Sequence, residues 1–524
     1  MSSEDFMQNR RKFIKRSALG AGGVLFLPSL LSSCTDHNIP DPQGPVLLPL
    51  LGDDYGDNFN WNDDGKIVVK TALSYIPVAG EMLSGLVDIF WPNSKPEIWP
   101  QIRAEVEALV QKDISDYAFS QVQGNLDGLR NVMLHYLDEL KNGEPGDIKA
   151  AFNDVRNDFD LYEPNFRDSL YAVPLLPLFG QFATMYLGLL RDGALFGASW
   201  GMTDGDVKSL VTWIDTKIGD YYGYTADTYN KGRGDVANNT KYDPYKMEPF
   251  KSINTYDRQM TLTVLDFMNS WPYFSVSSFP TAVTVELKRE IYSDPYGSSD
   301  NSTTSGGISF TPWGLMNSSI TVWASDRVDA VQSTYTGIDT VSQTPRWGVP
   351  VGGKVAGGAP STANTINISP NNPITKVRAL TGKYPFGGPD PVGPFACAFQ
   401  FQFNDNTTTK EFGSLINAQA GTTTDTGMFG YPGEALTLVF IHGGNKIIGG
   451  ADCVVFGFTP WESPQTTLRG ISALYVKSPT ERSEAEFDKA FPKLGISAGS
   501  ITEELKTARK EYWASINARA KQLK

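Results

Sequence analysis

The sequence predicts a multidomain α and β protein, in which a helical bundle precedes a domain of three antiparallel sheets and a C-terminal helical tail. Two observations lead to this prediction. The first is an uncharged run of 22 residues, 169–190, inside a region of long amphipathic helices. The second is a change of composition after Asp300, where short alternating segments recur three times. We therefore assign residues 66–295 to the bundle, 300–478 to the sheets and 479–524 to the tail.

Composition and charge exclude several classes of function. The chain of 524 residues has a formal net charge of −13, whereas a general nucleic-acid binder shows a basic surface. With three histidines and three cysteines, the chain has few side chains that could ligate zinc or a haem iron. We expect no nucleic-acid partner, no metal and no cofactor.

The N-terminus carries two export signals in succession. Arg10, Arg11 and Phe13 lie in the arrangement of a twin-arginine signal, and an apolar stretch follows them. The segment Leu-Ser-Ser-Cys that ends at Cys34 resembles a bacterial lipobox, with Cys34 as the lipidated residue.

These signals predict where the protein is located. Residues 1–33 would be a signal peptide, and residues 34–65, rich in Asp, Asn, Pro and Gly, would be a flexible tether. We expect an exported protein that a lipid on Cys34 anchors to a bacterial membrane or cell surface. Proteolysis in the tether would release it.

The uncharged run is long enough to cross a bilayer. As a helix it measures roughly 33 Å at ~1.5 Å per residue, about the thickness of the hydrocarbon core. Pro174, Pro177, Gln181 and Thr184 make it a poor permanent span. A helix that is apolar on all sides is either the centre of a bundle or a membrane segment. A protein that needs both states in turn is a pore former.

Apolar residues at helical spacing predict the surrounding helices. One long segment covers residues 102–140, with a break expected at 124–128. A second helix begins at Thr203, and a third runs from about residue 249 to 270. The bundle would contain six or seven helices in all.

Three segments of this region resemble the insecticidal delta-endotoxins, the Cry-type pesticidal crystal proteins. Residues 176–201 are similar to the central fifth helix of that family and its exit. The block Asp-Arg-Gln-Met-Thr-Leu-Thr-Val-Leu-Asp at 257–266 is similar to the seventh helix, and residues 279–295 resemble the strand that leaves the bundle. The resemblance covers roughly residues 67–295.

The resemblance implies a seven-helix bundle that docks on a membrane, opens and inserts the hairpin of its fourth and fifth helices. The fourth helix would be about 147–162, with Asp154 and Asp158 as pore-lining candidates. Tyr186 stands where the family usually has a histidine, so pH behaviour linked to that histidine is not expected. The membrane-inserting residues of the fifth helix would be Leu175, Leu178, Phe179, Phe182, Met185, Tyr186, Leu187 and Leu190.

The β half shows a threefold internal repeat of paired segments. They begin near Ser319, Ile374 and Leu436, with the second segment of each pair near Asp329, Cys397 and Asp452. One antiparallel sheet per repeat, with a shared core, resembles the β-prism of jacalin-like lectins and of the second domain of the toxins. The cysteines in the second and third repeats are expected to be buried free thiols rather than a disulfide.

The β-prism resemblance implies receptor binding through loops. Ser325-Asp326-Arg327-Val328-Asp329 is a degraded form of the Gly-x-x-x-Asp sugar loop of the lectins. Asp329 is therefore a sugar-binding candidate, and the alternative is an ordinary loop acid.

The chain departs from the toxin pattern after Pro479. Classical toxins continue into a third β-sandwich domain, whereas this sequence predicts a helix over residues 501–523 and no third domain. That helix would pack on the bundle or the sheets, or as a basic helix contact a membrane or a second copy.

An enzymatic function is not expected. Gly197-Ala198-Ser199-Trp200-Gly201 fits the Gly-x-Ser-x-Gly string, but a nucleophile elbow needs a strand before it and a helix is predicted there. Two hypotheses remain. The first is a pore-forming toxin that contacts target-cell lipid and a glycan or protein receptor, and forms a homo-oligomer in the membrane. The second is a surface lipoprotein with a carbohydrate-binding β-prism and no pore activity.

Overall fold

The structure is a computed structural model. It describes residues 114–243, 246–280, 289–298, 315–337, 362–384, 392–431, 433–443 and 451–461, with shorter pieces between residues 75 and 107, 283 and 285, and 346 and 360. The predicted export signal with Arg10, Arg11, Phe13 and Cys34, the tether, and the predicted helix at 501–523 lie outside the described residues.

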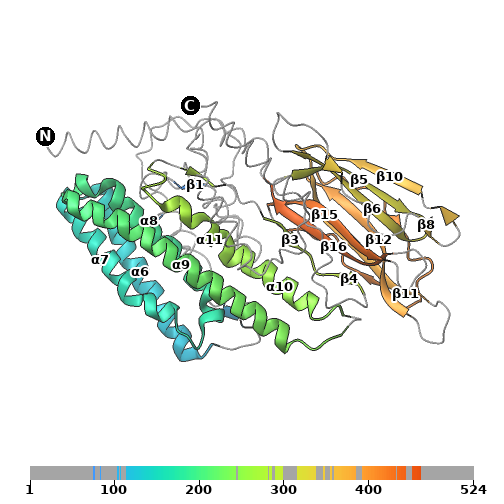
Figure 1. Ribbon diagram of the computed structural model, residues 1–524, viewed down its shortest axis with the longest axis horizontal. Coiled ribbons are helices and arrows are strands. Elements are labelled where there is room, and N and C mark those ends of the chain that lie inside the picture. Colours follow the sequence, from blue (N-terminus) through green and yellow to red (C-terminus); the bar gives the residue numbers. More distant parts are fainter. Residues whose placement is uncertain are drawn as a thin grey trace.

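Four long helices form the body of the helical domain (Figure 1). Three of them, α6, α7 and α9, begin at residues that suit a helix N-terminus. The Ser115 side chain accepts a hydrogen bond from the Ala118 amide, Pro145 occupies the first turn of the second helix, and Thr203 and Asp206 form a complete capping box. The helices are α6 (Asp116–Asn142), α7 (Pro145–Phe166), α8 (Ala172–Phe196) and α9 (Asp204–Asn239).

Helix α6 passes through the predicted break at residues 124–128 without interruption, so that prediction was wrong. Leu126, between the two glycines, and Leu129, directly after the second, are fully buried against the bundle. Their burial outweighs the cost of about 1 kcal/mol that a glycine adds to a helix interior.

The helix predicted over residues 249–270 is present, with a change of pitch in the middle. It consists of α10 (Phe250–Met260), the π-helical turn η5 (Thr261–Leu265) and α11 (Asp266–Ser270). The 3-10 turn η6 (Trp271–Phe274), which contains Pro272, ends it, and the 3-10 turn η4 (Gly197–Trp200) follows α8. With these segments the described residues confirm a helical bundle, whereas the total of seven helices stays a prediction.

Helix α8 is the centre of the helical domain, as predicted. All residues from Val173 to Ala194 are buried, and they form one apolar core with side chains from the helices around them. A helix that is apolar on all sides needs such an enclosure to remain out of water.

In the described part of the β domain there are three four-stranded antiparallel sheets, one for each predicted repeat. Each is built on a long hairpin, and the three predicted pairings are confirmed. The hairpins are β5 (Leu315–Ala324) with β6 (Val328–Gly337), β11 (Ile374–Tyr384) with β12 (Val392–Phe403), and β15 (Glu434–Gly443) with β16 (Ala451–Pro460).

Shorter strands complete these sheets. Strand β10 flanks β5, β7 flanks β6, and the second sheet has the order β13-β12-β11-β14. Both β3 and β4 pair with β16 in the third sheet, and two small sheets consist of β1 with β2 and β8 with β9. The bounds are β1 (Tyr75–Ile76), β2 (Val283–Thr284), β3 (Ile291–Tyr292), β4 (Tyr296–Gly297), β7 (Arg346–Trp347), β8 (Val355–Ala356), β9 (Ala359–Pro360), β10 (Thr362–Asn367), β13 (Phe412–Gly413) and β14 (Thr424–Asp425).

The three sheets share one core, as a β-prism requires. Val322, Phe399 and Phe456, one from each long hairpin, belong to the same buried cluster. The repeats also share a backbone feature. Gly297 and Gly413, both at positive φ, lie against Asp452 and Cys397, where an added Cβ would come within 2.2 Å of a backbone oxygen. Cys397 and Cys453 are buried thiols that form no disulfide, as predicted.

The two domains meet along the α10–α11 helix, which Figure 1 shows reaching toward the sheets. Arg289 forms buried ion pairs with Asp266 on α11, at 2.8 Å, and with Glu434 on β15, at 2.7 Å. The Arg258 guanidinium pairs with Asp294 at 2.7 Å. The helical domain is therefore joined to the β domain by buried charges as well as by the chain.

Candidate functional site: the α7–α8 hairpin

The site that the sequence predicts, the hairpin of the fourth and fifth helices, corresponds to α7 and α8. By length and composition, Ala172–Trp200 is the one helix among the described residues that could cross a membrane, with a mean hydropathy of 1.5 in its most apolar window. That window is entirely buried, a state that also suits the core helix of a soluble bundle. The predicted inserting residues are at most 1% exposed: Leu175, Leu178, Phe179, Phe182, Met185, Tyr186, Leu187 and Leu190.

Helix α7 is two-sided. Its inner face buries Phe152, Val155 and Phe159 against the bundle. On the outer side Asp154 is exposed and Asp158 is partly exposed. The structure thus places both pore-lining candidates on the solvent side of the hairpin and the apolar residues on the other side.

Aromatic rings join α7 to α8. Phe159 stacks on Tyr186 with ring centroids 4.9 Å apart, and Phe166 stacks on Phe182 at 4.4 Å. The Tyr186 hydroxyl donates to the Asp160 carboxylate at 2.6 Å. These contacts lie between α7 and α8. The two helices could therefore move together as a hairpin without losing them.

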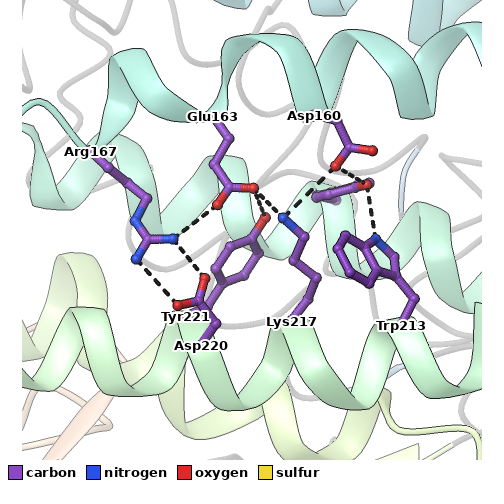
Figure 2. A network of polar contacts seen from close by, with 8 residues as sticks. Asp160, Glu163, Arg167, Trp213, Lys217, Asp220 and Tyr221 are labelled. Carbon is purple, nitrogen blue, oxygen red and sulfur yellow. Dashed lines mark hydrogen bonds and ion pairs between the residues drawn. The ribbon is translucent and has the colours of Figure 1, made fainter.

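A network of charged and polar side chains ties α7 to α9 (Figure 2). Its centre is Glu163 on α7, whose carboxylate accepts hydrogen bonds from three groups: the Arg167 guanidinium at 3.0 Å, the Lys217 ammonium at 2.5 Å and the Tyr221 hydroxyl at 2.8 Å. Arg167 also donates to both oxygens of Asp220, at 2.6 and 3.3 Å. We call these five residues, together with Asp160 and Trp213, the α7–α9 clamp.

The clamp lies between aromatic rings. The Lys217 ammonium is 5.0 Å from the Trp213 ring centroid and 5.3 Å from that of Tyr221. The side chains of Lys217 and Glu163 are each 11% exposed, so their attraction is screened less than that of a surface pair. Burial raises the pKa of Tyr221, and the Glu163 carboxylate raises it further. The hydroxyl therefore remains a donor at alkaline pH.

Sequence reasoning missed the clamp, although a signal for it was present. Glu163 follows Val155 and Phe159 at helical spacing on the buried face of α7, and Lys217 lies between Ile214 and Tyr221 on the buried face of α9. Opposite charges at core positions of two neighbouring helices indicate a buried pair.

The C-terminal half of α8 is held by a second set of polar contacts. The Arg191 guanidinium donates to the carbonyl oxygens of Phe274 and Phe279, at 3.2 and 2.8 Å. The Trp271 indole N–H donates to Thr184 Oγ1 at 2.9 Å, and the Tyr136 hydroxyl donates to Asp192 at 3.2 Å. Since α8 carries few polar groups, these contacts fix its rotation in the bundle.

The position of Asp329 does not fit the role of a sugar ligand. The residue lies on β6 with no exposed surface, and Arg327 Nε is 3.2 Å from its carboxylate. A sugar ligand needs oxygens that reach solvent, so the alternative of a structural acid suits the structure better.

The Gly-x-Ser-x-Gly string follows a helix rather than a strand, as predicted. Ser199 lies in the 3-10 turn η4, and its hydroxyl donates to the Phe196 carbonyl oxygen at 2.7 Å. No group of three or more metal-ligating side chains occurs among the described residues.

The fold and the hairpin define a class of protein: a helical bundle that encloses a membrane-length apolar helix, joined to a three-sheet β-prism. Residues 68–275 match the family model described as "delta endotoxin, N-terminal domain". Over these residues, about two fifths of the chain, it is similar to the N-terminal domain of the delta-endotoxins.

The chain is also similar to curated proteins over about half of its length. The chain is 31% identical over 275 residues to the pesticidal crystal protein Cry1Cb of Bacillus thuringiensis subsp. galleriae, a match that covers 51% of this chain and 23% of that protein. It is 28% identical over 246 residues to Cry8Ba of serovar kumamotoensis, covering 45% and 20%. The matches therefore span about a fifth of the length of these relatives.

Solved structures share the fold of both domains. The Bacillus thuringiensis insecticidal crystal protein Cry7Ca1 superposes with a TM-score of 0.61 at 18% identity, over 76% of this chain and 74% of that one. The structure of PirB superposes with a TM-score of 0.60 at 18% identity, over 77% and 96%.

Proposed function

We propose that the protein is a pore-forming toxin of the delta-endotoxin type, which inserts the α7–α8 hairpin into the membrane of a target cell. The observation that favours this function is the enclosure of α8, a helix long and apolar enough to cross a bilayer, inside a bundle. The match of residues 68–275 to the delta-endotoxin N-terminal domain supports it.

The two domains would have different roles. The β-prism would dock on a glycan or protein receptor, and the bundle would then open next to lipid. Leu170, in the loop between α7 and α8, is 67% exposed and would enter the bilayer first. Opening requires the α7–α9 clamp to break, because its contacts join the hairpin to a helix outside it.

In the inserted state, Asp154 and Asp158 would face the water of the pore. Charged side chains persist at membrane depth only where they face a lumen or a partner. The two carboxylates lie one helical turn apart on the side of α7 opposite its apolar face, which would then contact α8 and lipid.

The protein would reach its place of action through export. The twin-arginine signal and the lipidation of Cys34 remain part of the proposal, and mass spectrometry of the exported protein for a lipid on Cys34 tests them. Proteolysis of the tether would free the two folded domains.

Dye release from liposomes tests pore formation. Purified protein, with and without limited trypsin digestion, is expected to release small dyes and retain large ones, because a pore has a defined diameter. If liposomes that contain candidate receptors show no release while the β-prism binds glycans, the protein is a carbohydrate-binding surface lipoprotein instead.

Substitution of the outer carboxylates tests the pore lining. We expect Asp154→Asn/Asp158→Asn to lower the cation-to-anion permeability ratio of the pore several-fold in planar-bilayer recordings. The reason is that each copy would lose two negative charges from the lumen. The matched control is Asp227→Asn, an exposed aspartate on α9 outside the hairpin. An equal change in both variants would exclude α7 as the lining.

A further inference from the structure

The first sheet of the β domain has an uncharged outer face. Ile320 and Val322 on β5 belong to the shared core, so the residues that alternate with them, Thr321 and Trp323, point outward. Strands β5, β6 and β10 contain one charged residue, Asp329, which has no exposed surface. The outer face of these three strands is therefore electrically neutral.

Six residues on this face form what we call the platform. Strand β5 lies between β10 and β6, and the platform consists of two rows of paired residues across the three strands. In one row Trp323 has an alanine on each side, and in the other Thr321 has a glutamine and a threonine. The members are Thr321, Trp323, Ala330, Gln332, Ala363 and Thr365.

The platform combines a flat apolar surface with hydroxyl groups. Trp323 is partly exposed, and its alanine neighbours have no side-chain atom beyond Cβ that could stand above the sheet beside the indole. The hydroxyl oxygens of Thr321 and Thr365 are 3.0 Å apart and hydrogen-bonded. Since a hydroxyl can donate one hydrogen bond and accept two, the pair can bind a further polar group.

The outer faces of the other two sheets differ from this one. On the second sheet Arg378 forms an ion pair with Asp425 at 2.5 Å. On the third sheet Leu438 and Phe440 pack with Phe250 of α10, which makes that face part of the contact with the helical domain. Figure 1 shows β5 and β10 on the side of the β domain that is distant from α10. The helical domain therefore does not cover the platform.

We propose that the platform binds a neutral, β-linked polysaccharide whose pyranose hydroxyls are equatorial. The inference rests on the proposed docking of the β-prism on a glycan, and it specifies the site and the class of sugar. Equatorial hydroxyls leave only C–H groups on the two faces of the ring, so one face can stack on the Trp323 indole. The hydroxyls at the rim of the sugar can then bond with Thr321, Thr365 and Gln332.

The charge of the platform favours a neutral ligand over an acidic one. A sialylated or sulfated glycan would lose water from its anionic groups, and the outer face of β5, β6 and β10 offers no cation in exchange.

Affinity electrophoresis of the full chain tests the site. Gels contain hydroxyethylcellulose or glycol chitin, which are neutral and β-linked, or anionic polygalacturonate. We expect the two neutral polymers to retard the wild type and polygalacturonate to leave its mobility unchanged. Trp323→Ala should weaken binding about tenfold, because the stacking of a ring on an aromatic side chain contributes about that factor. Thr321→Val/Thr365→Val keeps the shape of both side chains and should weaken binding several-fold.

Two further variants separate binding from folding. Trp323→Phe keeps an aromatic ring and should retain most of the affinity. The matched control is Trp461→Ala, which removes a β-domain tryptophan outside the platform whose indole N–H donates to the Pro370 carbonyl oxygen at 3.3 Å. It should bind as wild type does, and circular dichroism shows whether each variant is folded.

Three outcomes would overturn the inference: no retardation by either neutral polymer, retardation by polygalacturonate alone, or equal affinity of wild type and Trp323→Ala. Dye release from liposomes without glycans tests the proposed pore separately, because it does not involve the platform. Release without glycan binding would overturn only the inference, whereas glycan binding without release from any liposome would count against the pore and leave the platform as a glycan site.

Discussion

Glu163 and Lys217 are charged residues at positions that the helical spacing of α7 and α9 assigns to the core. Each is buried, and the pair is completed by Arg167 and Tyr221, so the charges are compensated on several sides. A buried ion pair of this kind contributes little to stability compared with apolar residues, but removal of one partner is costly. The α7–α9 clamp therefore specifies which helices pack together.

At the residue scale, we predict that Glu163→Leu lowers the free energy of unfolding by about 3–5 kcal/mol, because the buried Lys217 ammonium loses its nearest carboxylate and keeps only the longer pair with Asp160, at 3.8 Å. Denaturant unfolding followed by circular dichroism measures this change. Glu163→Leu/Lys217→Met should recover much of the loss. The control, Lys231→Met, removes an exposed pair with Asp235 and should cost less than about 1 kcal/mol.

At the scale of elements, the two ends of α8 differ in how closely neighbours approach. A Cβ at Gly193 would lie 2.4 Å from the Phe152 ring on α7 and 3.1 Å from Leu210 on α9. A Cβ at Gly180 would meet Val264 at 3.6 Å, an ordinary contact. Helices α7 and α9 thus approach α8 more closely at Gly193 than the η5 turn does at Gly180.

This difference gives a paired prediction for the same helix. Gly193→Ala should destabilise the bundle by about 1–3 kcal/mol, because Phe152 must move. Gly180→Ala should leave stability unchanged or raise it by about 0.5–1 kcal/mol, because alanine favours a helix. Thermal unfolding of the two variants provides the measurement, and the same effect in both would show that the packing at Gly193 is not tight.

Buried tyrosines on α9 and α10 limit the stability of the bundle at alkaline pH. Burial raises the pKa of Tyr221, Tyr229 and Tyr256, and the Asp257 carboxylate raises it further for Tyr229 and Tyr256. In the unfolded chain these phenols ionise near pH 10. The folded state binds the protons more tightly, so stability is level below about pH 10 and falls as pH rises beyond it.

We therefore predict that the bundle remains folded up to about pH 10 and that the buried phenols ionise only as it unfolds. Absorbance of phenolate and circular dichroism, followed together against pH, measure the two events. Ionisation of all tyrosines in a bundle that is still folded would contradict this prediction.

At the scale of the whole molecule, Arg289 connects the domains. Burial alone lowers the pKa of its guanidinium, but the carboxylates of Asp266 and Glu434 raise it well above the ordinary value, so the cluster stays charged. The two acids belong to different domains, and each would lose the buried cation that it pairs with if the arginine were absent. The domains should therefore unfold together.

Arg289→Met tests this coupling. We expect a loss of about 3–5 kcal/mol and the separation of one calorimetric transition into two, because the helical and β domains no longer share buried charges. The matched control Arg378→Met removes an exposed pair with Asp425 inside the β domain and should leave a single transition. If Arg289→Met also unfolds in a single transition, apolar contacts alone are enough to couple the unfolding of the two domains.

The sequence by itself determined the elements of this protein. The uncharged run, the capping box at Thr203 and the threefold β pattern are local signals, and the structure has a helix or hairpin at each. The resemblance at residues 257–266 was also local, and it pointed to the delta-endotoxin family. Periods of 3.6 and 2 residues, together with caps, depend only on neighbours along the chain.

Only the tertiary structure decided which side chains meet. Glu163 and Lys217 are 54 residues apart, and Arg289 and Glu434 are 145 apart, so no local pattern pairs them. The burial of Asp329 likewise depends on packing from all sides. Local pattern fixes which face of an element is apolar, whereas the partner of a polar group on that face is set by how distant elements pack.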